Sequence, residues 1–222
     1  MKKYLLILAA IILCGNLAAQ DNKQAYKDQQ KASKRTREVR MEKAGKDASK
    51  EAKKLTKEGW KPMPGKLPLD KQIDKALSMQ VELDDEGDLK YIYAVSLATA
   101  GSTAAGQMAA SAAAREQIAS QMGVSLTALL DNRMETNQIS VTEAETISEV
   151  AQKGKQIFSQ DLGRTENILE AYRVLPNKNV EVMVGIAYSQ SEARKQMAKA
   201  VKKAFEEKNL QSASIDEKLG WK

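Results

Sequence analysis

The sequence predicts an α+β protein in which a small, mostly antiparallel sheet of about four strands packs with helices. Residues 166–175 and 180–188 alternate in side-chain character and are joined by a turn, which predicts a β-hairpin. Capping boxes at 140–143 and 189–192 predict the starts of two helices. The expected order over residues 89–208 is β-α-β-α-β-β-α, and a basic helical or disordered extension precedes it.

The chain begins with the three-part pattern of a secretory signal. Lys2 and Lys3 are positively charged, residues 4–13 are apolar, and residues 17–19 resemble a cleavage site. The apolar run is too short to span a bilayer, which takes about 20 residues. We therefore expect residues 1–19 to be a signal peptide and the protein to be exported, to the periplasm or to the outer membrane.

The single cysteine, Cys14, lies within this leader and leaves two outcomes open. A lipoprotein signal has a small residue before the cysteine, whereas Leu13 stands here. This departure favours ordinary cleavage near Ala19, with lipidation at Cys14 as the alternative. Cleavage at Ala19 would leave a mature chain without cysteine, so its stability must come from packing.

The composition excludes several kinds of active site. The chain has no histidine, which removes the commonest general base and the usual partner of a nucleophilic serine. Histidine and cysteine are the ordinary zinc ligands, so we expect neither a metal site nor a cofactor. A site built from carboxylates alone stays open.

The basic character belongs to the extension, residues 20–62. Residues 21–62 carry a net charge of +7, whereas residues 63–222 carry −3. The composition favours helix but shows no clear apolar stripe, so we expect a solvated or partly disordered segment. The functional alternative is an arm that contacts anionic lipid, lipopolysaccharide or another polyanionic partner. Its contact residues would be Lys31, Lys34, Arg35, Arg37, Arg40, Lys53 and Lys54. Nucleic acid is disfavoured, because few aromatic residues accompany the basic ones.

Residues 63–88 are expected to link the extension to the body. The proline- and glycine-rich segment 59–65 ends the extension. A short helix is predicted over 68–82, with Trp60 anchoring the joint to the body. The acidic segment 84–88 contains a glycine and lacks the ligand spacing of a calcium loop, so we interpret it as a turn.

The body begins with a predicted strand over residues 91–98, whose two faces are both fairly apolar, as in a strand covered on both sides. The glycine-rich turn 101–106 follows, but it lacks the Lys and Ser/Thr of a phosphate-binding loop. Ser102 or Thr103 is instead expected to cap a helix.

That helix is rich in alanine, which lets it lie close to a sheet, and it is expected to end at Gly123. Apolar residues at period two then predict a strand over 124–136. Helix is the competing interpretation, because some of the same residues also fit a 3.6-residue period.

The remainder consists of a helix over about 141–158, the hairpin with its turn at 176–179, and a helix after Ser189. One face of the last helix is apolar and consists of Ala193, Met197, Val201 and Phe205. The basic residues elsewhere on it predict a solvated face. The tail, residues 209–222, is expected to be loosely held.

The body resembles the Lpp-twenty-type family of bacterial envelope lipoproteins and the related N-terminal domain of a flagellar accessory protein. The resemblance covers about residues 89–190. It rests on the aromatic strand 91–95, the alanine-rich segment 112–119, and the hairpin strands 168–172 and 180–184. It implies an envelope protein without a defined catalytic site. The leader and the basic extension depart from the family pattern.

Three functions are consistent with these features. The first is a non-enzymatic envelope module that binds a protein partner or an anionic envelope surface. The second is a carboxylate-dependent hydrolase that uses a pair drawn from Glu143, Glu145, Glu166 and Glu170. Capping explains Glu143, and a solvent-facing position on a strand explains Glu170. The third is a self-assembling structural protein, against which the lack of heptads argues. We favour the first.

Overall fold

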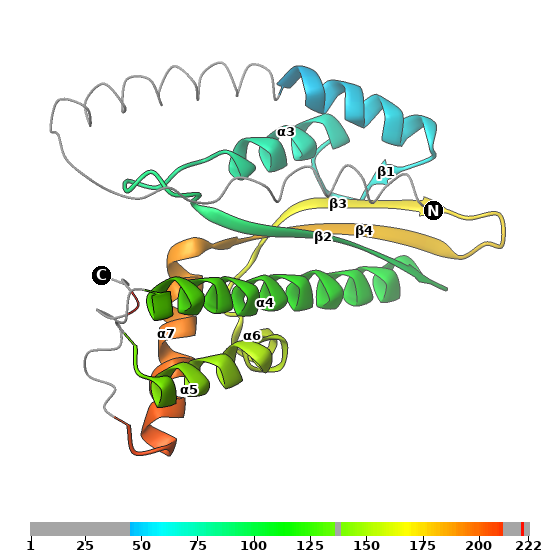
Figure 1. The fold of residues 1–222 in the computed structure, drawn as a ribbon. Coiled ribbons are helices and arrows are strands. Elements are labelled where there is room, and N and C mark those ends of the chain that lie inside the picture. Colours follow the sequence, from blue (N-terminus) through cyan, green and yellow to red (C-terminus); the bar gives the residue numbers. More distant parts are fainter. Residues whose placement is uncertain (1–44, 136–138, 211–218, 220–222) are drawn as a thin grey trace, which may run out of the picture. The chain divides into compact units, whose positions relative to one another are not determined.

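A four-stranded antiparallel sheet in the order β1-β3-β4-β2 forms the centre of the protein (Figure 1). Its strands are β1 (Lys61–Pro62), β2 (Tyr91–Ala100), β3 (Glu166–Val174) and β4 (Val180–Ser189). The structure is a computed structural model that describes residues 45–135, 139–210 and 219. These all belong to one unit, residues 39–222.

Helices cover both faces of this sheet (Figure 1). A helical segment over residues 45–57 and α3 (Leu69–Gln80) cover one face, which we call the α3 face. The long helix α4 (Thr103–Glu135) lies against the opposite face, the α4 face. The other helices are α5 (Val141–Gln152), α6 (Gly154–Asp161) and α7 (Gln190–Glu207). The predicted α+β class with a four-stranded antiparallel sheet is confirmed, but the expected order of elements is wrong, because the fourth strand is β1 rather than residues 124–136.

The alanine-rich part of α4 lies close to the sheet, as its composition predicts. Ala110 and Ala114 are fully buried. At Gly106 a side chain would not fit, because a Cβ there would lie 2.6 Å from Val182 Cγ2. Ser102 Oγ accepts a hydrogen bond from the N–H of Ala105 at 3.2 Å, so the expected cap is present. Small residues thus set the distance between helix and sheet.

The predicted strand over 124–136 is wrong, because α4 continues through this segment to Glu135. Leu126 and Leu130 are buried one helical turn apart, whereas Val124 is 67% exposed. Gly123 does not end the helix. A Cβ at Gly123 would lie 2.8 Å from the carbonyl oxygen of Ala151, so this glycine permits α4 to pass close to the end of α5.

The hairpin forms as predicted, with one irregularity. The carbonyl of Asn179 accepts the N–H of Leu175 at 2.8 Å across the turn. The register shifts between Asn167 and Leu169, so β3 carries a bulge. Ile168 therefore packs on the α3 face, although simple alternation would place it on the face of Glu170.

Both predicted helix caps are present. At the start of α5, Ser140 and Glu143 form the complete capping box. At the start of α7, Ser189 Oγ accepts the N–H of Glu192, but the predicted capping box is incomplete, because the Glu192 side chain pairs with Lys195 instead. The predicted apolar face of α7 is buried, and it consists of Ala193, Met197, Val201 and Phe205.

The described part of the extension differs from its prediction. Residues 45–57 form a helix that buries Ala48, Ala52 and Leu55 against the sheet. Two alanines and one leucine make a stripe too narrow to stand out in the sequence. Lys61 and Pro62 then pair with β3 as the fourth strand, where an edge position tolerates the missing proline N–H.

Trp60 anchors this joint, as expected. Its side chain is 3% exposed, and the Arg173 guanidinium lies 4.7 Å from the ring centroid. The tail contradicts its prediction at one residue, because Leu219 is 1% exposed and belongs to the main core. Residues 211–218 and 220–222 lie outside the described part of the chain.

Candidate interaction surfaces

Three of the four candidate carboxylates have contacts of their own, and the fourth is exposed. Glu143 accepts the N–H of Ser140 at 2.8 Å and serves as a helix cap. Glu145 is exposed on α5. Glu166 forms an ion pair with Lys75 on the α3 face. Within the described residues, these contacts pair none of the four side chains with another.

Glu170 is not on a solvent-facing side of its strand, which corrects the sequence-based expectation. Its side chain is buried at the α4 face, because Glu170 pairs with Val184, whose side chain lies in the core on that face. Gln107 Nε2 donates to Glu170 Oε1 at 2.8 Å, and Asn167 Nδ2 donates to the same oxygen at 3.1 Å. Lys66 Nζ lies 2.5 Å from Oε2.

This cluster satisfies both oxygens of a buried carboxylate, as burial of a charge requires. It holds one carboxylate, whereas glycoside hydrolysis uses two at about 5–9 Å. Among residues 45–135, 139–210 and 219, no group of three or more acidic, histidine or cysteine side chains could hold a metal. Sequence reasoning missed Gln107 and Lys66, which are far from Glu170 along the chain and lie in no recognisable motif.

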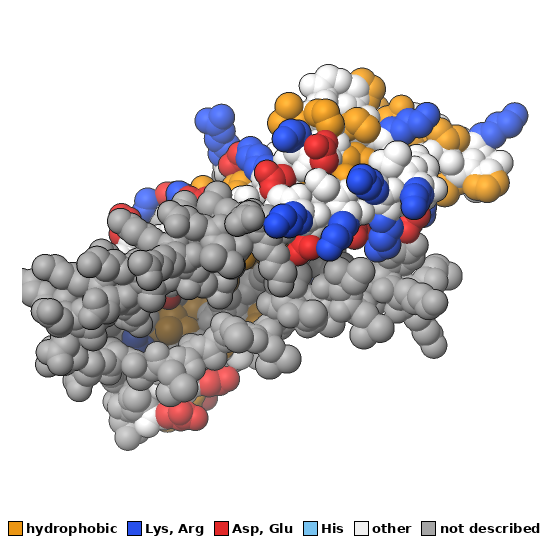
Figure 2. Space-filling model, turned by 90° about the horizontal axis from the view of Figure 1, so that it is seen from above, with side chains coloured by type: hydrophobic (Ala, Val, Ile, Leu, Met, Phe, Trp, Pro, Cys, Tyr) orange, Lys and Arg blue, Asp and Glu red, His pale blue; other side chains and the backbone are white. Residues whose placement is uncertain are grey.

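A basic surface covers the outer side of the 45–57 helix and the elements next to it. Ala48, Ala52 and Leu55 are buried against the sheet, so the opposite side of this helix faces solvent. The lysines of the helix are exposed. We call this the lysine surface, and its exposed members are Lys50, Lys53, Lys54, Lys57, Lys61 and Lys71. Figure 2 looks down on this side of the molecule and shows lysine and arginine side chains on it, with acidic side chains between them.

Only some members of the lysine surface form ion pairs. Lys50 and Lys54 form exposed ion pairs with Asp47 and Glu51 of the same helix. Within the described residues, Lys53 and Lys57 form no ion pair. Of the predicted contact residues, the structure therefore places Lys53 and Lys54 on one helix face. The others, Lys31, Lys34, Arg35, Arg37 and Arg40, lie outside the described residues.

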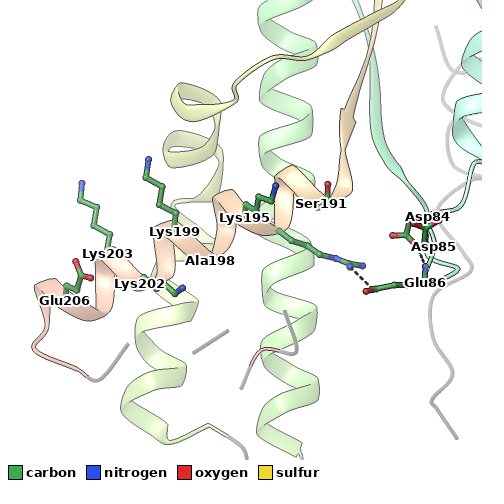
Figure 3. Close-up of a pocket in the computed structure, with 11 residues that line it drawn as sticks. Asp84, Asp85, Glu86, Ser191, Lys195, Ala198, Lys199, Lys202, Lys203 and Glu206 are labelled. Carbon is green, nitrogen blue, oxygen red and sulfur yellow. Dashed lines mark hydrogen bonds and ion pairs between the residues drawn. The ribbon is translucent and has the colours of Figure 1, made fainter. Parts of the chain in front are cut away.

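A second charged region is an open cleft of about 900 Å³ between α7 and the turn 84–86 (Figure 3). Its α7 wall carries Lys195, Lys199, Lys202 and Lys203, and its opposite wall is acidic. Arg194 joins the two walls, because its guanidinium lies 2.6 Å from Asp88 and 3.5 Å from Glu86. We call this region the charged cleft.

The acidic wall is a well-formed turn, as predicted. Asp84 Oδ1 accepts the N–H groups of Glu86 and Asp88 at 3.0 and 2.9 Å. Gly87 supplies the positive φ of 91° that the turn requires. The acidic side chains are therefore held by the turn itself, and the cleft presents charges of both signs rather than one.

The shifted pKa values have local causes. A hydrogen bond from Lys208, followed by the attraction of its charge, lowers the pKa of Glu149. A hydrogen bond to Glu82 raises the pKa of Lys90. Burial raises the pKa of Tyr93 and Tyr188. Each of these shifts follows from an ion pair or from burial, so the shifts indicate structural contacts.

Comparison of the chain with protein-family models, with curated proteins and with solved structures finds no match. The resemblance to the envelope lipoprotein family therefore stays a prediction. Among the helices of the described residues, none combines the length and the apolar character that crossing a membrane requires.

Proposed function

We propose that the protein is an exported, non-enzymatic component of the cell envelope that binds an anionic envelope surface. The observation that carries this proposal is the lysine surface. A packed helix holds exposed cations on the outer side of the α3 face, and two of them, Lys53 and Lys57, form no ion pair within the described residues. Basic residues near an anionic surface contribute about 1 kcal/mol each.

The packing of the 45–57 helix supports a binding role over a purely solvated one. A solvated helix would need no fixed orientation, whereas this one buries Ala48, Ala52 and Leu55 and faces its lysines outward. The predicted basic segment that precedes it in sequence would add further cations. For the hydrolase alternative, three of its four candidate carboxylates, Glu143, Glu166 and Glu170, are each engaged by a different partner.

The decisive measurement is co-sedimentation of the isolated protein with vesicles. We expect binding to phosphatidylglycerol-containing vesicles, weakening with salt, and little binding to phosphatidylcholine vesicles. The variant Lys53→Glu/Lys57→Glu should bind at least about tenfold more weakly, because two cations become anions. Its matched control is Lys199→Glu/Lys203→Glu, which makes the same change on α7.

Two results would overturn the proposal. Equal binding to neutral and anionic vesicles would show that charge does not direct the interaction. Equal losses in the two double variants would show that net charge, rather than the lysine surface, decides. Parallel measurements with lipopolysaccharide micelles distinguish a lipid headgroup phosphate from a saccharide-borne one.

The export part of the proposal is tested separately. The mass of the protein isolated from envelope fractions gives its N-terminus, and we expect Gln20 after cleavage near Ala19. A lipidated protein would instead begin at Cys14 and carry acyl mass, and Cys14→Ser would then change its fractionation. Recovery of the uncleaved chain from the cytoplasm would contradict export.

A further inference from the structure

We propose that two copies of this chain pair through the free edge of β2, which extends the sheet across a two-fold axis. β2 is an end strand of the sheet, since the order is β1-β3-β4-β2. All ten of its residues pair with β4 on one side. Within the described residues, no strand pairs with its other side.

The backbone groups on this free edge can be identified. The carbonyl of Lys90 accepts the N–H of Gln190, the residue that directly follows β4. Every second residue from Lys90 onward therefore directs its N–H and C=O groups toward β4. The residues between them point their N–H and C=O groups outward. Gln121 Nε2 donates to the carbonyl of Tyr93 at 3.1 Å. This hydrogen bond confirms that the backbone groups of Tyr93 point away from β4, and it engages the outward carbonyl at that residue. The outward-bonding residues beyond it are Val95, Leu97 and Thr99.

The edge lacks the features that normally prevent pairing. Protective edges carry lysine, proline, bulges or inward charges. β2 has none of these and pairs with β4 in unbroken register. Residues 91–114, which span β2 and the first part of α4, contain no charged residue. Leu97 lies in the middle of the free segment and is 52% exposed.

The neighbouring helix continues this uncharged surface. Gln107 of α4 donates a hydrogen bond to Glu170 on β3, so Gln107 lies on the flank of α4 that faces β3. Ala105 and Ala109 are two residues away on either side, about 200° around the helix, and therefore lie on the β2 flank. Both are exposed. Small uncharged residues there leave room for a second sheet to continue past β2.

A second copy fits this edge better than an unrelated strand does. An antiparallel pair about a two-fold axis at Leu97 places Leu97 opposite its counterpart and Val95 opposite Thr99. These pairings join apolar and β-branched side chains, which stabilise cross-strand contacts. No like charges meet, because the strand has none. The surface is therefore complementary to itself.

Sedimentation equilibrium on the isolated protein tests the pairing. We expect a concentration-dependent dimer for the wild type. Leu97→Lys should raise the dissociation constant at least about tenfold, because two lysines would face each other across the axis. Val124→Lys is the matched control, since it changes another exposed apolar residue, 67% exposed on α4, and should dimerise like the wild type.

Mixing variants tests the register. Leu97→Asp should also be monomeric, whereas a mixture of Leu97→Asp and Leu97→Lys should form a heterodimer, because opposite charges then meet at the axis. Hydrogen exchange of the wild type gives a readout without substitution, and we expect protection of Val95, Leu97 and Thr99 to rise with protein concentration.

Several results would overturn the proposal. One is a wild-type protein that stays monomeric at all accessible concentrations. Another is an equal rise in the dissociation constant for Leu97→Lys and Val124→Lys. A mixture of the two charged variants that stays monomeric would reject this register. Edge protection that appears only when another envelope protein is added would replace the second copy with a different partner.

Discussion

The two faces of the sheet are built differently. The α4 face supports one continuous core that contains both phenylalanines of the chain, Phe158 and Phe205. The α3 face supports two smaller clusters, one around Trp60 and one around Met79. The first face is covered by α4 together with further helices that pack on one another, whereas the second is covered by α3 and by a helix whose outer side is basic.

This difference separates stability from interaction. The free energy of folding depends on buried apolar area, and most of it lies at the α4 face. The 45–57 helix contributes a narrow apolar stripe and presents lysines to solvent. We therefore expect the α3 face to open locally at a lower free energy than the α4 face does.

The largest effect is expected from Phe205→Ala in the main core. Phe205 is fully buried, so its truncation should lower the free energy of unfolding by about 3–5 kcal/mol. Urea denaturation measures this loss. Met108→Ala is the control, because Met108 is 76% exposed and should change stability by no more than about 0.5 kcal/mol. Similar losses in both would contradict the position of the core.

A smaller and more local effect is expected from Leu55→Ala on the α3 face. The substitution should lower the free energy of unfolding by about 2–3 kcal/mol, because neighbouring side chains can partly fill the cavity that it leaves. Hydrogen exchange should accelerate in residues 45–57 and stay unchanged in the middle of α4. Lys53→Ala on the same helix should leave exchange as it is. Equal acceleration on both faces would show that they unfold together, and the comparison would fail.

The two charges of the Glu170 cluster should respond unequally to substitution. Lys66→Met leaves a buried carboxylate without its cation and should cost about 1–3 kcal/mol. Glu170→Gln keeps an oxygen that can accept from Gln107, and water can solvate Lys66, whose side chain is 45% exposed. We therefore expect it to lower the free energy of unfolding by about 1 kcal/mol or less. Urea denaturation at neutral pH compares the two, and the reverse order would contradict burial of this carboxylate.

The smallest effect concerns a surface pair between α5 and the end of α7. The Lys208 side chain lowers the pKa of Glu149, so Lys208→Met should raise that pKa toward its ordinary value. A carboxyl whose pKa is lowered on folding stabilises the folded protein at pH values above its pKa in the unfolded chain. This stabilisation is lost as the pH falls through the lower pKa of the folded protein. NMR titration measures the shift. Lys203→Met should leave Glu149 unchanged, and an equal shift would show a general charge effect.

Local features of the fold could be predicted from the sequence. The caps at Ser140 and Ser189, the hairpin turn, and the buried face of α7 depend on residues within a few positions of one another. Short-range hydrogen bonds and side-chain periods decide such features. For the candidate sites, the sequence identified Lys53 and Lys54 and the four carboxylates, but not their surroundings.

Tertiary packing decided the rest. Residues 124–135 satisfy both a strand and a helix period, and the passage of Gly123 past Ala151 permits the helix to continue. One extra residue in β3 turns Ile168 to the α3 face, whereas Glu170 faces α4, where Gln107 and Lys66 meet it from distant segments. The stripe of the 45–57 helix and the burial of Leu219 likewise depend on surfaces formed elsewhere in the chain.

The sequence by itself thus determined the α+β class, the hairpin and the helix caps, because each follows from neighbouring residues. Only the tertiary structure decided which small apolar residues are buried, which carboxylate is enclosed and which strand edge stays free. Those outcomes depend on the free energy of contacts between segments far apart in the chain, and no local period or motif records them.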